Sequence, residues 1–99
     1  MTKFETILED LKSEEIEIPD TLDAIARLIK KDWSKQGKGV NYAAKPYLDA
    51  MSTMNSINDK YGYDSGHSIV AYFLGNATSW KGVVAKAVKL KLNKMLKGK

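Results

Sequence analysis

Apolar residues recur at intervals of three and four positions along most of this chain, and that spacing favours amphipathic helices. No run of alternating β-branched residues accompanies it, so the sequence carries no comparable signal for a sheet. The chain has 99 residues, enough for one domain with one modest hydrophobic core. The predicted fold class is therefore all-α: a compact single-domain bundle of about five helices over residues 1–99.

The first predicted helix covers residues 3–13 and holds three acidic side chains, Glu5, Glu9 and Asp10, with Glu14 and Glu15 directly after it. Thr2 and Glu5 have the spacing of a capping box, in which each side chain satisfies an exposed amide of the first turn. Pro19 disfavours helical conformation at the residue before it, so the helical run ends there. We expect this acidic helix to be followed by the core of the bundle over residues 20–97.

Four further helices make up the predicted core. Asp20 is a suitable N-cap for the second, Pro46 fits the first turn of the third, and Asp64 or Ser65 caps the fourth. The fourth is apolar nearly all round, which predicts a central position in the bundle. These helices are expected over about 21–35, 46–61, 65–74 and 79–96, and the polar stretch 55–59 is a point at which the third could fray early. Eight side chains are expected to be mostly buried: Trp33, Met54, Tyr72, Phe73, Leu74, Trp80, Val84 and Val88.

Charge is distributed unevenly along the chain. Residues 1–32 hold nine acidic and five basic side chains, whereas residues 65–99 hold seven lysines and no acid. The basic part is suited to an anionic partner, although the same distribution arises if the two ends of the chain fold against each other. Net charge informs the choice of partner rather than the fold, so both interpretations stay open.

The residues that could carry chemistry are few. The chain has no cysteine, which excludes disulfides, thiol catalysis and Cys-built zinc sites. Its one histidine, His67, follows Asp64 and Ser65 too closely for a catalytic triad, which needs side chains from separate elements. Lys38 lies between two glycines, but the spacing lacks the Walker pattern of phosphate loops. We therefore predict that the protein is not an enzyme and binds no cofactor and no metal.

Lysines of the last helix are the candidates for contact with nucleic acid. They could follow a phosphate backbone, with affinity that falls steeply with salt. The stretch has no arginine, and one of its lysines lies where a helix-turn-helix motif needs a buried apolar residue, so such binding would be weak in sequence selectivity. A solvated helix face is the simpler interpretation. The candidate residues are Lys81, Lys86, Lys89, Lys94 and Lys97.

Five tyrosines are many for a domain of this size. A tyrosine combines an apolar ring with a polar tip, which suits both the edge of a core and a binding surface. The sequence favours the core edge over an interface. The tyrosines are Tyr42, Tyr47, Tyr61, Tyr63 and Tyr72.

Four short motifs resemble those of small proteins of phages, prophages and plasmids. They are KDW at 31–33, AKPYLDAM at 44–51, YGYDSG at 61–66 and YFLGNA at 72–77. The resemblance covers about residues 26–96 and leaves the acidic N-terminal helix outside it. It brings no catalytic residue with it. It implies an accessory protein of a mobile element. Such proteins often bind and disable host machinery, including restriction and CRISPR effectors.

These observations together predict a non-enzymatic interaction protein that acts by stoichiometric binding to a host or phage protein, for example as an anti-CRISPR or anti-restriction inhibitor. A small nucleic-acid-binding regulator is the alternative. The N-terminus lacks a signal-peptide pattern and the longest apolar run is six residues, so we expect a cytoplasmic protein with no membrane partner. Its oligomeric state is left open. The candidate partner-binding residues are Glu5, Glu9, Asp10, Glu14 and Glu15.

Overall fold

The computed structural model describes residues 17–98, which form four helices and one short two-stranded hairpin. The mostly helical architecture is confirmed. The predicted first helix, residues 3–13, lies outside the described part of the chain. The elements are α2 (Leu22–Trp33), α3 (Lys45–Met51), β1 (Lys60–Tyr61), β2 (Asp64–Ser65), α4 (Gly66–Gly75) and α5 (Val83–Lys97).

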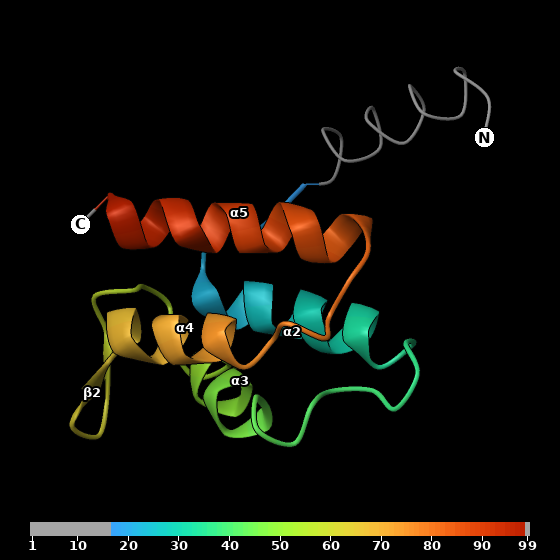
Figure 1. Ribbon diagram of the computed structural model, residues 1–99. Coiled ribbons are helices and arrows are strands. Elements are labelled where there is room, and N and C mark those ends of the chain that lie inside the picture. Colours follow the sequence, from blue (N-terminus) through green and yellow to red (C-terminus); the bar gives the residue numbers. More distant parts are fainter. Residues whose placement is uncertain (1–16, 99) are drawn as a thin grey trace.

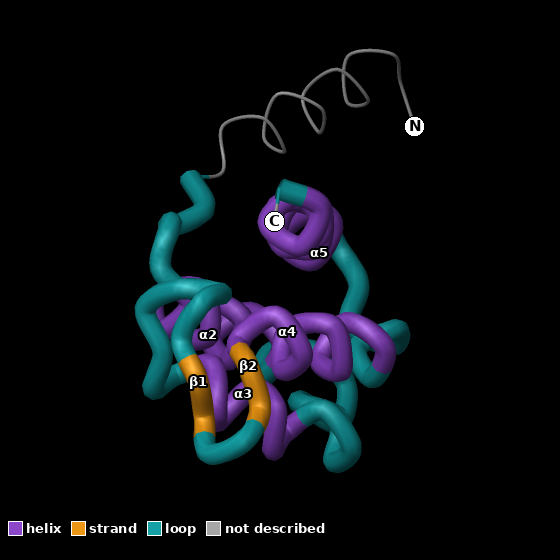
Figure 2. The backbone as a smooth tube through the Cα atoms, turned by 90° about the vertical axis from the view of Figure 1, so that its left-hand side faces the viewer, coloured by secondary structure: helices purple, strands orange, loops and turns teal. Residues whose placement is uncertain are grey.

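The helices are arranged in three layers. Figure 1 shows α5 lying across one side of the molecule, with α2 and α4 beneath it and α3 on the far side. Figure 2, turned by 90°, shows the hairpin β1–β2 beside α3 on the side away from α5. Both α2 and α4 contact α3 and α5. The central position predicted for α4 is therefore shared with α2.

The core is built around three aromatic side chains. The rings of Trp33 and Trp80 are stacked, with centroids 5.7 Å apart, and Phe73 meets both rings edge-on. Five of the eight predicted core side chains are buried: these three, Met54 and Val88.

Three predicted core residues lie further out. Leu74 and Val84 are only partly buried against the core. Tyr72 was predicted to be buried, and this is wrong, because its side chain is 52% exposed. Its ring instead packs against Tyr47 at the surface, with centroids 5.5 Å apart.

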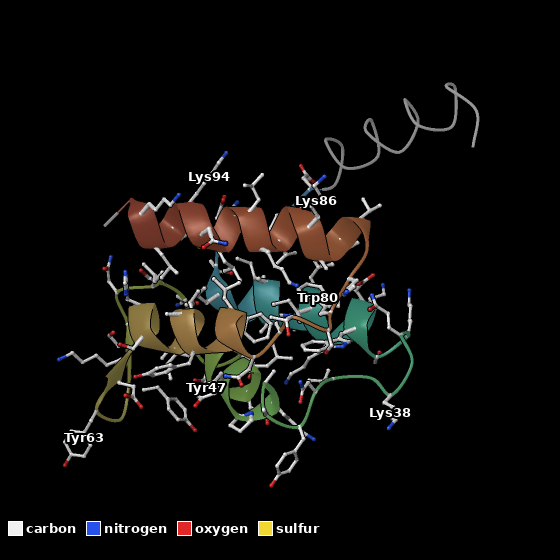
Figure 3. The ribbon with its side chains drawn as sticks, in the orientation of Figure 1. Lys38, Tyr47, Tyr63, Trp80, Lys86 and Lys94 are labelled. Carbon is white, nitrogen blue, oxygen red and sulfur yellow. The ribbon has the colours of Figure 1, made fainter. Side chains whose placement is uncertain are left out.

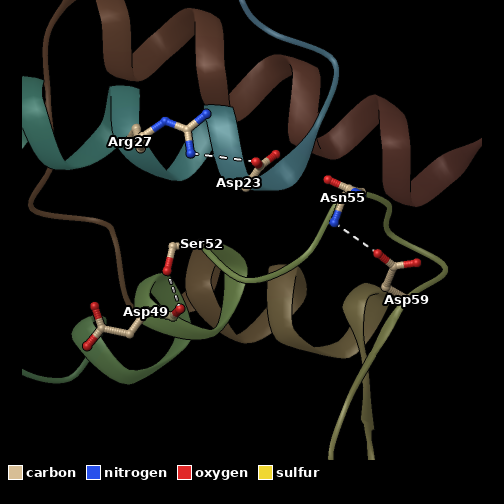
Figure 4. A network of polar contacts seen from close by, with 6 residues as sticks. All are labelled: Asp23, Arg27, Asp49, Ser52, Asn55 and Asp59. Atoms are coloured by element: carbon tan, nitrogen blue, oxygen red, sulfur yellow. Dashed lines mark hydrogen bonds and ion pairs between the residues drawn. The ribbon is translucent and has the colours of Figure 1, made fainter.

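The third helix is shorter than predicted and ends at Met51 rather than near residue 61. Hydroxyl and carboxylate side chains compete for the backbone at this point. The hydroxyl of Ser52 donates to the carbonyl of Asp49, and the carboxylate of Asp59 accepts from the backbone amide of Asn55 at 2.9 Å (Figure 4). These bonds satisfy the backbone carbonyl of Asp49 and the backbone amide of Asn55 outside a helix, so the helix does not continue.

The hairpin β1–β2 was not predicted. Lys60 pairs with Ser65 and Tyr61 with Asp64 in an antiparallel register. The two-residue loop between the strands begins with Gly62, whose φ of 65° is readily adopted by glycine at the first central position of a hairpin turn. The predicted cap of the next helix is confirmed at Ser65, whose hydroxyl accepts from the amide of Ser68 at 3.1 Å.

The entry into α2 also differs from the prediction. The N-cap is Thr21, whereas the carboxylate of Asp20 accepts from the ammonium of Lys91 on α5, with 2.5 Å between oxygen and nitrogen. The same ammonium donates to the carbonyl of Ile18 at 3.0 Å. The segment that leads into α2 is therefore tied to the middle of α5. Among the described helices, none has the length and apolar character needed to cross a membrane.

Candidate interaction surfaces

A network of polar contacts holds α5 over α2. The indole N–H of Trp80 donates to the carboxylate of Asp32 at 2.9 Å, and the side-chain amide of Gln36 donates to the same oxygen at 3.1 Å. Gln36 also donates to the carbonyl of Lys81 at 2.7 Å. Because these contacts join the end of α2 to the loop before α5, they fix where the lysines of α5 face.

Two lysines of α5 are used inside the fold. The ammonium of Lys89 donates to the carbonyl of Trp80 at 2.7 Å and lies 5.8 Å from the centroid of its ring, within the range of a cation–π contact. Burial, helped by the nearby charge of Lys81, lowers the pKa of Lys89. Lys91 is paired with Asp20. Lys89, a candidate for nucleic-acid contact, is thus placed apart from the other candidates on α5.

The remaining candidates on α5 form what we call the lysine stripe: Lys86, Lys94 and Lys97. All three are exposed, and Figure 3 shows Lys86 and Lys94 projecting from the outer side of the helix. Leu90, which is 59% exposed, lies among them in the sequence of the helix. Lys81, in the loop before α5, is exposed as well.

The acidic residues proposed from the sequence as partner-binding lie outside the described part of the chain. Glu5, Glu9, Asp10, Glu14 and Glu15 all lie outside residues 17–98.

Around His67 the side chains have structural partners. One ring nitrogen of His67 lies 3.3 Å from the carbonyl oxygen of Leu96, and the hydroxyl of Ser65 is engaged as the cap of α4. Asp64 is exposed in the hairpin. Within residues 17–98 there is no cluster of three or more His, Cys, Asp or Glu side chains suited to a metal ion.

Four of the five tyrosines belong to the hairpin, α3 and α4. Tyr63 is fully exposed at the tip of the hairpin, and Tyr61 and Tyr72 are each about half exposed. In Figure 3 Tyr63 and Tyr47 lie on the side away from Lys86 and Lys94. The interpretation of the tyrosines as edges of the core fits Tyr47, which is partly buried against it, and is wrong for Tyr42 and Tyr63, which are almost fully exposed. We call this surface, formed by the hairpin, α3 and α4, the tyrosine face: Tyr47, Tyr61, Tyr63 and Tyr72.

Two open grooves lie beside the loop that joins α2 to α3, with Val40 in the wall of both. One has a volume of about 610 Å³ and runs from Trp33 along the loop to Tyr42, which is 92% exposed. The other, about 560 Å³, is lined in part by Lys45 and Leu48 of α3. We call these two hollows the loop grooves.

The sequence did not reveal the loop grooves or the contact between Asp32 and Trp80. The contact joins residues 48 positions apart, and no periodic pattern encodes such a pair. The sequence contains a weak indication of the loop beside the grooves, namely Gly37 and Gly39 on either side of Lys38. Glycine permits left-handed turns, which can direct a loop away from the core.

The chain was compared with protein-family models, with curated proteins and with solved structures, and none of the three comparisons gave a match.

Proposed function

We propose that this chain is a non-enzymatic interaction protein that binds a protein partner stoichiometrically through the tyrosine face. The observation that carries the proposal is the exposure of Tyr61, Tyr63 and Tyr72 on adjoining elements. Tyrosine is enriched at the centres of protein interfaces, because its ring supplies contact area while its hydroxyl remains hydrogen-bonded.

The elements under the tyrosine face are well fixed, which reduces the entropy lost on binding. Tyr47 and Tyr72 pack against each other between α3 and α4. At the hairpin, the cap at Ser65 joins β2 directly to α4, and the amide of Gly66 donates to the carbonyl of Asp59 at 2.6 Å. A partner would therefore meet tyrosines whose backbone positions are already set.

The resemblance to small proteins of phages, prophages and plasmids supports a setting for this function. The partner is a host or phage protein in the cytoplasm, and its capture disables a defence system such as restriction or CRISPR interference. The acidic segment 3–13 is proposed as a fifth helix that, together with the two glutamates after it, offers a second surface, where the carboxylates occupy a groove built for nucleic acid. The residues of that surface are Glu5, Glu9, Asp10, Glu14 and Glu15.

Affinity isolation from a bacterial lysate tests this proposal with two matched triple variants. One replaces Tyr61, Tyr63 and Tyr72 by Ser, and the other replaces the lysine stripe by Ser. The proposal expects the wild type and the lysine variant to retain one protein partner in a one-to-one complex, and the tyrosine variant to lose it. Retention of that partner by a folded tyrosine variant, or recovery of no protein partner by the wild type, would contradict it.

A second candidate function is a nucleic-acid-binding regulator that uses the lysine stripe. It is supported by the shared exposure of Lys86, Lys94 and Lys97 and by the absence of acidic residues from 65 to 99. Since lysine contacts phosphate as a point charge, the binding would be weak, salt-dependent and nearly independent of sequence. A gel-shift titration with duplex DNA at low salt tests it, and no shift under those conditions would eliminate it.

A further inference from the structure

We infer that the partner presents an acidic polypeptide segment with apolar side chains, and that this segment is anchored in the loop grooves beside Val40. The inference rests on the proposed function and adds the chemistry of the partner and a second point of contact.

The larger groove is lined mainly by apolar atoms, whereas polar and apolar atoms line the smaller groove about equally. Trp33 lies at the base of the larger groove, is only 2% exposed, and is held by its stacking on Trp80. Val40 lines both grooves, and the buried Leu48 lines the smaller one. Their volumes fall within the range of about 300–1,000 Å³ that is usual for ligand sites. Each groove therefore has room for an apolar side chain of a partner.

Contacts within the chain fix the conformation of the loop that joins α2 to α3. Gly37 and Gly39 have φ values of 38° and 81°, which side chains other than glycine rarely adopt. The amide of Gly39 donates to the carbonyl of Gln36 at 2.6 Å, and the side chain of Asn41 accepts from the amide of Ala43 at 2.9 Å. Gln36 is itself held by the network described above. Such preorganisation lowers the cost of binding an extended segment.

The charge at the rims selects an acidic occupant. Lys38 borders the larger groove and Lys45 the smaller one, and both are exposed. Asp49 is the acidic residue among the described groove-lining side chains, and its carboxylate lies 3.1 Å from the ammonium of Lys30. Its charge is thus already matched within the chain. Carboxylates of a partner would meet Lys38 and Lys45, which gives electrostatic complementarity.

A polypeptide suits this site better than a single-stranded nucleic acid. Sites for single strands offer aromatic faces on which successive bases stack. Here the ring of Trp33 is almost completely covered, and Tyr42 is the exposed ring among the described lining residues. The grooves present the partly exposed Val40 and the single open ring of Tyr42 rather than a series of open rings.

Fluorescence anisotropy with three labelled probes tests the inference. The probes are the peptide Asp-Glu-Trp-Glu-Asp-Leu-Glu, the same peptide with each acid replaced by Lys, and a twelve-nucleotide oligothymidylate. The variants are the pair Lys38→Glu with Lys45→Glu and, with the same change in net charge, the pair Lys86→Glu with Lys94→Glu. We expect only the acidic peptide to bind tightly, with affinity about tenfold weaker in the loop variant and changed less than about twofold in the control.

Three results would overturn the inference: no binding of the acidic peptide, equal losses in the two variants, or tighter binding of the oligothymidylate. The partner isolated with the wild type separates this inference from the proposed function. If the loop variant keeps that partner while the tyrosine variant loses it, the tyrosine face stands as the binding surface and the loop grooves do not.

Discussion

Trp80 and Asp32 are joined by a 2.9 Å hydrogen bond from the indole N–H to the carboxylate, and this bond connects the end of α2 with the start of α5. Trp80 is completely buried. Replacement of Asp32 by Ala would leave the indole N–H without its acceptor, which costs about 1–3 kcal/mol. Urea unfolding followed by tryptophan fluorescence should show this loss.

Asp64→Ala serves as the control for that experiment, because Asp64 is exposed in the hairpin. It should change the free energy of unfolding by less than about 0.5 kcal/mol. Equal stability of Asp32→Ala and Asp64→Ala would show that the contact does not hold α5 in place.

Gly66 and Gly75, at the two ends of α4, should respond in opposite ways to substitution by Ala. A Cβ at Gly66 would lie 2.7 Å from the carbonyl oxygen of Ile57, whereas a Cβ at Gly75 meets nothing within 4 Å. We expect Gly66→Ala to destabilise the fold by about 1–3 kcal/mol through overpacking. Gly75→Ala should be neutral or stabilise it by up to about 1 kcal/mol. Thermal unfolding of the two variants would contradict this expectation if their midpoints moved together.

The ion pair between Asp20 and Lys91 should appear in acid titration. The hydrogen bond and the charge of Lys91 lower the pKa of Asp20 below its ordinary value. The contribution of this pair to the free energy of unfolding is therefore fully present above the pKa of aspartate in the unfolded chain, about 3.9. It is lost as the pH falls through the lowered pKa of Asp20 in the folded protein. In Lys91→Met the pKa of Asp20, measured by carbon NMR of the carboxyl group, should return toward the ordinary value. An unchanged pKa would mean that the pair does not form in solution.

Salt dependence should distinguish the lysines of α5 from one another. If the lysine stripe contacts three phosphates of duplex DNA, the logarithm of affinity should fall against the logarithm of salt with a slope of about −2.7. Each substitution of Lys86, Lys94 or Lys97 by Gln should reduce the size of that slope by about 0.9. Lys89→Gln should leave it unchanged, because the ammonium of Lys89 is bound to Trp80. A change of slope in Lys89→Gln equal to the others would contradict this assignment.

The local signals in the sequence predicted most of the helices. Apolar spacing located α2, α4 and α5, and Ser65 and Pro46 lie at helix starts as their chemistry suggested. The early end of α3 has a local physical cause. Polar side chains near residue 52 bonded to the backbone and ended α3, which apolar spacing does not show.

The exposure of the tyrosines could not be predicted for a different reason. Tyr72 lies in an almost wholly apolar helix, so its burial depended on which elements cover which side of α4. That information belongs to the packing of α3 and α5 around α4 and not to the periodicity of one segment. Likewise, Lys89 and Lys86 look alike in sequence, and only the position of Trp80 separates their roles.

Hydrogen exchange of the chain with its isolated partner tests the central claim most directly, because it reports which side of the molecule the partner covers. The account predicts slower exchange of backbone amides at 60–65, in the hairpin, and at 70–75, in α4, with no change at 86–97. Protection confined to residues 86–97 of α5 would contradict it and would assign binding to the lysine stripe instead.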